Sequence, residues 1–523
     1  MNKDLTFRGA LIGLLGCIII TCSSMYSALR MGALPWPSAF VTVLSMAVLT
    51  ALGKTNLHEI NVTHTIMSAG AMVAGGLAFT LPGLWMTEPD SGFPFFKFMV
   101  LAIGGALLGT IFTYLNKDRL LEQPFPIGTS SSQTLEVGIE HGKPALWLFA
   151  SFAAAALFTV LRDALGLIPA VIVLFAGSAV LPAFTIWLSP MAMGIGAIIG
   201  PGLSLYWLGS SLAANFVLVP GLQWIGSIGQ AGAVVIKENL GLGLMIGTGV
   251  GILIKLLIDL VKDRSSRAAY KLDRTRLILV ACSLVIMALV VLFTDIGIVD
   301  GIITLVGIFI ATNLSGVLTG QTGINPMEIF AMLVLLACGL AGRPTAIQSF
   351  SITAIVAVSC GLGGDILNDL KSGKLLGTDN RKQVIGEAIG GVAGAVTAVF
   401  ALYILKKAFG GFGTEFFPAP QAAAVKSMVE GLSSPLTFLV GMGLGVALYL
   451  LGLPAATIGL GAYLSINISS IVGIGSLLAS AFKALSRDKS SLSAKMNLVG
   501  SGFLGGEGAA GVIIALAMVA RLS

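Results

Sequence analysis

The segment from Gln123 to His141 reads Gln-Pro-Phe-Pro-Ile-Gly-Thr-Ser-Ser-Ser-Gln-Thr-Leu-Glu-Val-Gly-Ile-Glu-His and lies between two long apolar runs. It is too polar to span a bilayer, and Pro124 and Pro126 break any helix that arrives from the preceding run. The hydroxyl groups of residues 129–132 can cap a new short helix that starts there. We interpret the segment as a Pro-broken hairpin that dips into a membrane, as in the binding sites of secondary transporters. The alternative is an ordinary Pro-capped helix on the surface.

A similar segment occurs at residues 417–432. Its two prolines and its glutamate each follow their counterparts in the first segment by 294 residues; the pairs are Pro124 with Pro418, Pro126 with Pro420, and Glu136 with Glu430. This second copy favours the hairpin interpretation over the surface helix.

The composition identifies a polytopic membrane protein. Of 523 residues, 56% are hydrophobic and only 10% are charged, whereas soluble domains carry roughly 25% charged residues. The 67 glycines suit close contacts between helices in lipid. The net charge of +6 is spread over short loops, so it bears on membrane topology and does not indicate nucleic-acid binding.

Apolar runs of about 20 residues predict an all-α fold with about sixteen transmembrane helices. One of the expected spans covers residues 167–188. Glycines and prolines recur in the two halves at offsets between 294 and 259, so we expect two unequal internal repeats, each with one hairpin. The predicted parts are a first repeat at 1–262, a basic linker with a joining helix at 263–295, and a second repeat at 296–523.

The basic loops set the expected orientation. They place the N-terminus in the cytoplasm together with the loops at 262–276, 365–382 and 483–495. The first apolar run has a poor cleavage site and is expected to be a retained span of a bacterial inner-membrane protein.

Several function classes are not supported. The five cysteines lie in apolar runs without a Cys-x-x-Cys pair, so we expect neither a disulfide framework nor a metal site. His58, Glu59 and His64 do not form a metalloprotease motif, because the histidines are six residues apart and not four. No nucleotide-binding motif and no hydrolase constellation are found, so we expect a non-enzymatic protein without a cofactor. A channel remains an alternative.

Three stretches resemble the oligopeptide transporter family, which includes the yellow-stripe-like carriers of metal chelates. They are Glu59-Ile-Asn-Val-Thr-His64-Thr65, Phe125-Pro-Ile-Gly-Thr129 and Asp365-Ile-Leu-Asn-Asp-Leu-Lys371-Ser-Gly373. Gly502-Phe-Leu-Gly-Gly-Glu507-Gly508 resembles the terminal Gly-Glu segment of the family. The resemblance implies a proton-coupled importer of small peptides or peptide-like compounds such as glutathione, working by alternating access. Metal-chelate import is the alternative. The resemblance also suggests a homodimer.

Candidate substrate residues come from the hairpins, the first of the resembling stretches and a Gly/Pro-broken segment at 321–328, which could offer amide and carboxylate groups to the ends of a peptide. They are Asn61, His64, Pro126, Gly128, Thr129, Ser130, Gln133, Gln321, Thr322, Asn325, Pro420 and Gln421.

Acids within or beside apolar spans are candidate proton carriers, because such groups are costly in a membrane. The clearest is Glu507, flanked by glycines in the last span; a purely structural ion pair is its alternative. The others are Glu59, Glu136 and Glu328.

The stretch at 365–382 carries charges of both signs, and we expect a solvated gating loop there that contains Asp365, Asp369 and Lys371. The two aspartates share one helix face. They could serve a proton or a metal ion only if they were drawn inside the protein.

Overall fold

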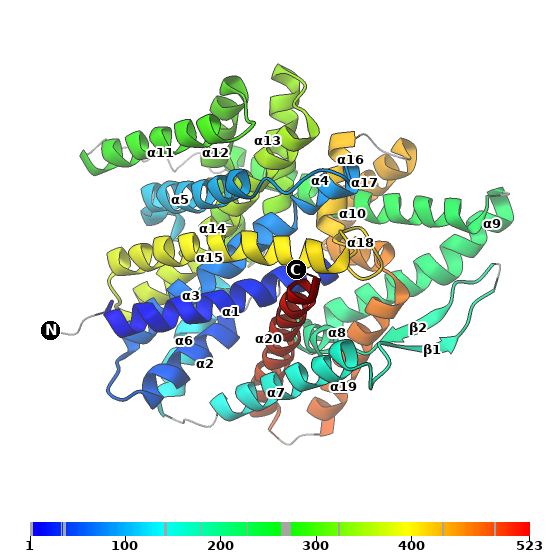
Figure 1. Cartoon of the computed structure of the whole chain (residues 1–523), viewed down its shortest axis with the longest axis horizontal. Coiled ribbons are helices and arrows are strands. Elements are labelled where there is room, and N and C mark those ends of the chain that lie inside the picture. The colour runs from blue at the N-terminus through cyan, green and yellow to red at the C-terminus, as the bar shows by residue number, and fades with distance from the viewer. Residues whose placement is uncertain are drawn as a thin grey trace. The chain divides into compact units, whose positions relative to one another are not determined.

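The computed structural model describes residues 4–32, 34, 38–140, 144–178, 180–226, 228–262, 274–322, 325–430, 434–485 and 488–522. Over these residues the chain is helical except for one β-hairpin (Figure 1). Twelve of the described helices are long and apolar enough to cross a membrane, and three apolar helices are shorter. The predicted all-α polytopic class is therefore confirmed, with fewer long spans than the sixteen expected.

The chain divides into two compact units. Unit 1 consists of Met1–Leu157, Asp273–Val429 and Ser501–Ser523, and unit 2 of Phe158–Leu272 and Glu430–Gly500. Each unit therefore takes segments from both of the predicted repeats, and the repeats themselves stay a prediction.

Unit 1 is built mainly from α1 (Phe7–Met31), α2 (Ser38–Ala51), α3 (Leu57–Ala78), α4 (Pro82–Thr87), α5 (Phe95–Leu120), α6 (Pro126–Glu140), α7 (Pro144–Thr159), α11 (Arg274–Phe293), α12 (Ile298–Thr322), α13 (Met327–Ala341), α14 (Ala346–Leu376), α15 (Asn380–Phe409) and α16 (Pro420–Glu430). Unit 2 contains η1 (Val160–Ala164), β1 (Val171–Phe175), β2 (Phe184–Trp187), α8 (Pro190–Ala213), η2 (Ala214–Leu218), α9 (Val219–Gly226), α10 (Gln230–Lys262), α17 (Pro435–Leu450), α18 (Ala455–Tyr463) and α19 (Ile466–Leu485). The last helix, α20 (Lys489–Leu522), begins in unit 2 and ends in unit 1.

The prediction of a transmembrane helix at residues 167–188 is wrong. This stretch forms the antiparallel hairpin of β1 and β2, with Val171 paired to Trp187 and Val173 to Thr185. The run Val171-Ile172-Val173 is β-branched, and such residues favour strands over helices. Hydropathy alone does not distinguish a short apolar strand pair from a helix.

The centre of unit 1 is a close-packed helix group. Helices α1, α3, α5, α14 and α15 run side by side there (Figure 1). Glycines bring their backbones together: a Cβ on Gly109 of α5 would lie 2.5 Å from Ser359 O of α14, and a Cβ on Gly394 of α15 would lie 2.4 Å from Gly70 Cα of α3. In lipid such small residues allow the close approach that stabilises helix pairs.

The two predicted hairpin segments each contain a short helix, α6 and α16, that begins at its second proline. The residue before that proline has a positive φ in both, 45° at Phe125 and 39° at Ala419, and no other described non-glycine residue does. We expected the first of these helices to start near Thr129, but it starts at Pro126, because proline is favoured in the first turn, where its missing N–H costs no hydrogen bond.

The two turns make reciprocal backbone contacts. Phe125 N donates to Gly320 O at the end of α12 (2.8 Å), and Ala419 N donates to Leu29 O at the end of α1 (2.9 Å). Ala419 follows Phe125 by 294 residues and Gly320 follows Leu29 by 291, which are the offsets seen in the sequence. Each hairpin thus binds a helix from the opposite predicted repeat.

Candidate functional site

The acids of the predicted gating loop lie inside unit 1. Asp365 and Asp369 belong to α14, which runs unbroken to Leu376 and is capped by Gly377 at a φ of 77°. Both aspartates are 3% exposed. The expectation of a solvated loop is therefore wrong: the charges do not mark a helix end, because the two acids lie one turn apart on the face that points into the protein. Because the two aspartates are drawn inside the protein, they could serve a proton or a metal ion.

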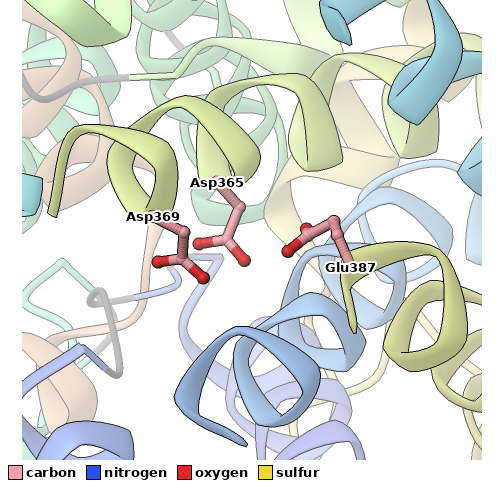
Figure 2. Close-up of side chains that lie close together, drawn as sticks. All are labelled: Asp365, Asp369 and Glu387. Atoms are coloured by element: carbon pink, nitrogen blue, oxygen red, sulfur yellow. The ribbon is translucent and has the colours of Figure 1, made fainter. Parts of the chain in front are cut away.

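Glu387 of α15 completes a cluster of three carboxyl groups. One oxygen from each of Asp365, Asp369 and Glu387 lies within 4.8 Å of the others. Figure 2 shows the two aspartates on α14 turned toward the glutamate on the neighbouring helix. Glu387 has no exposed surface. We call these three residues the carboxylate cluster.

Helix α3 supplies the polar neighbours of the cluster. Ser68 Oγ donates to Asp369 Oδ2 (3.2 Å), and His64 Nδ1 lies 3.6 Å from Asp369 Oδ1. His64 is 1% exposed, and neither of its ring nitrogens has a hydrogen-bond partner. From α15, Gln383 Nε2 donates to the backbone oxygen of Asp369 (2.8 Å) and fixes the two helices against each other.

The sequence analysis did not single out Glu387, which lies near the start of an expected apolar span, just after the basic residues at 381–382. The useful signal is the spacing of Gly386, Gly390 and Gly394, which form one helix face at every fourth residue. A Cβ on Gly390 would lie 2.3 Å from Ile66 O of α3. This glycine face brings α15 against α3 and places Glu387 beside the aspartates.

The charge of the cluster must be compensated. Asp365 Oδ2 and both carboxylate oxygens of Glu387 are buried without a hydrogen-bond partner, and none of the ion pairs among the described residues joins the cluster to a lysine or arginine. Two ionised carboxylates within 4.8 Å of each other repel by at least ~3.5 kcal/mol at an effective dielectric constant of about 20. A proton or a bound cation therefore has to neutralise part of the charge. With His64 alongside, these oxygens could also hold a hard metal cation.

Another side of α14 holds the first hairpin. Asn368 Oδ1 accepts from Gly128 N at the start of α6 (3.1 Å), and Lys371 Nζ donates to Gln123 O (2.8 Å). A Cβ on Gly128 would lie 2.2 Å from Asn368 O. The helix that carries the two aspartates is thus bound directly to the turn that opens α6.

The predicted proton carriers have different surroundings. Glu59 is bound by Arg8 (2.7 Å) and accepts from Thr6 and Thr55, so it belongs to a satisfied ion-pair network. Glu136 is exposed and Glu328 is half-buried. Glu507 is fully buried in α20, beside Gly506, which packs on Phe152. Glu507 therefore stays a candidate.

The predicted substrate residues are dispersed over unit 1, and His64 is the one that lies at the cluster. Several are tied to the protein itself: Asn61 to Thr378, Asn325 to Cys360 O, Gly128 to Asn368, Thr129 to Pro124 O, and Gln421 to Gly32 O, against which Pro420 also packs. Pro126 and Ser130 are exposed. The side chains of Gln133, Gln321 and Thr322, as well as His141, lie outside the described residues. Their role in binding stays a prediction.

Comparison with known proteins identifies the family. The family model described as "OPT oligopeptide transporter protein" matches residues 4–254 and 273–518. The chain belongs to the OPT family. A curated relative from Haemophilus influenzae, described provisionally as an oligopeptide transporter, is 24% identical over 614 aligned positions that cover 95% of this chain and 93% of the relative.

OPT membership confirms the resemblance expected from the motifs. It fits the multi-pass membrane architecture, and membership of a transporter family implies non-enzymatic transport. The matched residues include α3, α14 and α15, so the carboxylate cluster lies within the residues that the family model matches.

Proposed function

We propose that this OPT protein is a secondary importer of small oligopeptides in a bacterial inner membrane, driven by the proton gradient through the carboxylate cluster. The observation that carries the proposal is the position of three buried carboxyl groups, joined to no lysine or arginine among the described ion pairs, in a group of helices long and apolar enough to cross a membrane. Ionisable residues at membrane depth are costly, and they mark ion or proton pathways in transporters.

In this mechanism the cluster exchanges a proton between the two sides of the membrane. With the proton bound, its charge is reduced and α3, α14 and α15 pack closely. When the proton leaves, repulsion among Asp365, Asp369 and Glu387 separates α14 from α15. Because Asn368 and Lys371 bind the turn that precedes α6, movement of α14 changes the position of the first hairpin.

The reciprocal hairpin contacts support a movement of one predicted repeat against the other. Phe125 binds the end of α12 and Ala419 binds the end of α1, so each repeat holds the hairpin of its partner. Broken segments at the interface of two repeats are typical of alternating-access transporters, so they favour a transporter over a channel.

The proposal is tested by uptake into proteoliposomes. The purified protein is offered trialanine, glutathione and a ferric chelate, each with and without an inward proton gradient. We expect a peptide to accumulate against its gradient and to leak out when a protonophore is added. Peptide entry that is unaffected by the protonophore would contradict proton coupling.

Metal-chelate import is the second candidate, favoured by the family resemblance to yellow-stripe-like carriers. Gradient-driven entry of the ferric chelate without entry of either peptide would select it. The proposed homodimer is tested separately, by the mass of the protein–detergent complex in multi-angle light scattering.

A further inference from the structure

Unit 2 contains a broken helix beside a cavity, and neither the family nor the carboxylate cluster accounts for it. Helix α8 is interrupted at Gly200, where φ is 77° and ψ is 172°, and Pro201 follows. Ser204 Oγ donates to Gly196 O at 3.2 Å, although residues eight apart in a straight helix are separated by about 12 Å. The chain therefore bends back sharply at Gly200, and α8 is two helical segments joined by a tight turn.

Such a turn exposes two opposite ends of helices. The last carbonyl groups of the first segment and the first N–H groups of the second have no partners within their own segments. The carbonyl end attracts a cation and the N–H end attracts an anion. A Cβ on Gly200 or Gly202 would meet nothing within 4 Å, so there is open space at the turn.

A cavity of about 470 Å³ lies at this turn. Gly200 and Pro201 line it on one side, and α19 and α20 contribute Lys483 and Asn497. Lys483 is exposed and donates to Ser493 Oγ, which also lines the cavity (3.2 Å). The volume falls in the range of roughly 300–1,000 Å³ that holds small organic ligands.

We propose that this cavity binds the transported peptide, with its terminal carboxylate at Lys483 and the start of the second α8 segment, and its terminal ammonium at the carbonyl end of the first. A short zwitterionic peptide matches both ends of the turn. The inference rests on the proposed function, since it assigns that substrate to a site. Most of the predicted hairpin residues of unit 1 are hydrogen-bonded or packed within the protein, whereas this cavity has room for a short peptide.

The position of the cavity also indicates which side it opens to. Lys483 lies in the last turn of α19, at the start of the basic stretch 483–495 that the charge distribution is expected to place in the cytoplasm. The cavity is therefore the substrate site of an importer in its inward-facing state, from which the peptide leaves.

The test compares two ligands on the purified full-length protein. Affinities for trialanine and for trialanine amide, which lacks the terminal carboxylate, are measured by calorimetry for the unchanged protein, Lys483→Gln and Lys495→Gln. Lys495 is exposed on α20 and lies outside the cavity lining, so it is the matched control. We expect the unchanged protein and the control to prefer trialanine by about tenfold, because a charge-assisted hydrogen bond is lost with the amide, and Lys483→Gln to bind both peptides equally.

A second pair of variants locates the ligand without changing charge. Ala484→Phe places a phenyl ring in the cavity, and Leu485→Phe places the same ring at the exposed neighbouring residue outside the lining. We expect only Ala484→Phe to lose trialanine binding. A full tenfold preference in Lys483→Gln, or unchanged binding in Ala484→Phe, would overturn the assignment while leaving peptide transport in place. Failure of the unchanged protein to bind either peptide would contradict both this assignment and peptide import.

Discussion

Replacement of Glu387 by glutamine should change how the stability of the protein depends on pH. When the cluster holds a proton that the unfolded chain releases, the stability of the protein falls as pH rises. The variant keeps the shape of the side chain and removes one charge. With oxygens within 4.8 Å, each remaining carboxylate is relieved of ~3.5 kcal/mol of repulsion at an effective dielectric constant of about 20.

The magnitude follows from the number of protons involved. Loss of one retained proton changes the slope of the unfolding free energy by ~1.4 kcal/mol per pH unit. For 523 residues, an unfolding entropy of ~2.1 cal/mol/K per residue converts this to about 1 °C per pH unit.

Tryptophan fluorescence in detergent, followed on heating between roughly pH 5 and roughly pH 9, measures the slope. The other titratable side chains nearest the cluster, His64 on α3 and Cys17 on α1, are the same in both proteins. Glu136→Gln, which changes an exposed acid, is the control and should behave as the unchanged protein. Equal slopes for Glu387→Gln and the unchanged protein would refute the shared-proton argument.

Two further variants test the surroundings of the cluster. Gly394→Ala should lower the free energy of unfolding by about 1–3 kcal/mol, because its Cβ would lie 2.4 Å from Gly70 Cα. Gly339→Ala, with open space around its Cβ, should be neutral or stabilising. Heat denaturation distinguishes the two variants, and equal stability would contradict the helix packing described above. Glu507→Gln should slow proton-driven peptide uptake while keeping peptide counterflow; undiminished proton-driven uptake would remove Glu507 from the proton path.

The sequence was sufficient for the membrane class, the family and the presence of a short helix in the first hairpin segment, although not for the residue at which that helix starts. Those features depend on hydropathy, on proline and on motifs that are local in the chain. The prolines at 126 and 420 have the same effect in any context, because they lack a backbone donor.

The carboxylate cluster could not be predicted in the same way. Asp365 and Asp369 look solvated next to Lys371 and Lys374, because the sequence does not show which face of a helix is buried. In the structure Lys371 extends to Gln123 O at the edge while the aspartates turn inward. The position of Glu387 beside the aspartates depends on the contact between α15 and α3. That contact is made by glycines of α15 packing on residues of α3 that lie more than 300 positions earlier in the sequence.

The cavity of unit 2 was missed for a related reason. The Gly200-Pro201 pair lies within a long apolar stretch, and hydropathy does not show whether such a pair kinks a helix or reverses it. The strand pair at 171–187 was misassigned on the same basis. In both cases the apolar character was correct and the backbone conformation was not.

The most direct test of the central claim is proton movement that accompanies peptide. Proteoliposomes with a pH-sensitive dye in the lumen are given trialanine outside, without any imposed gradient. The account predicts that the unchanged protein acidifies the lumen on addition of trialanine, and that Glu387→Gln exchanges labelled peptide in counterflow without acidification. Acidification by Glu387→Gln at the rate of the unchanged protein would contradict the claim that the carboxylate cluster couples protons to transport.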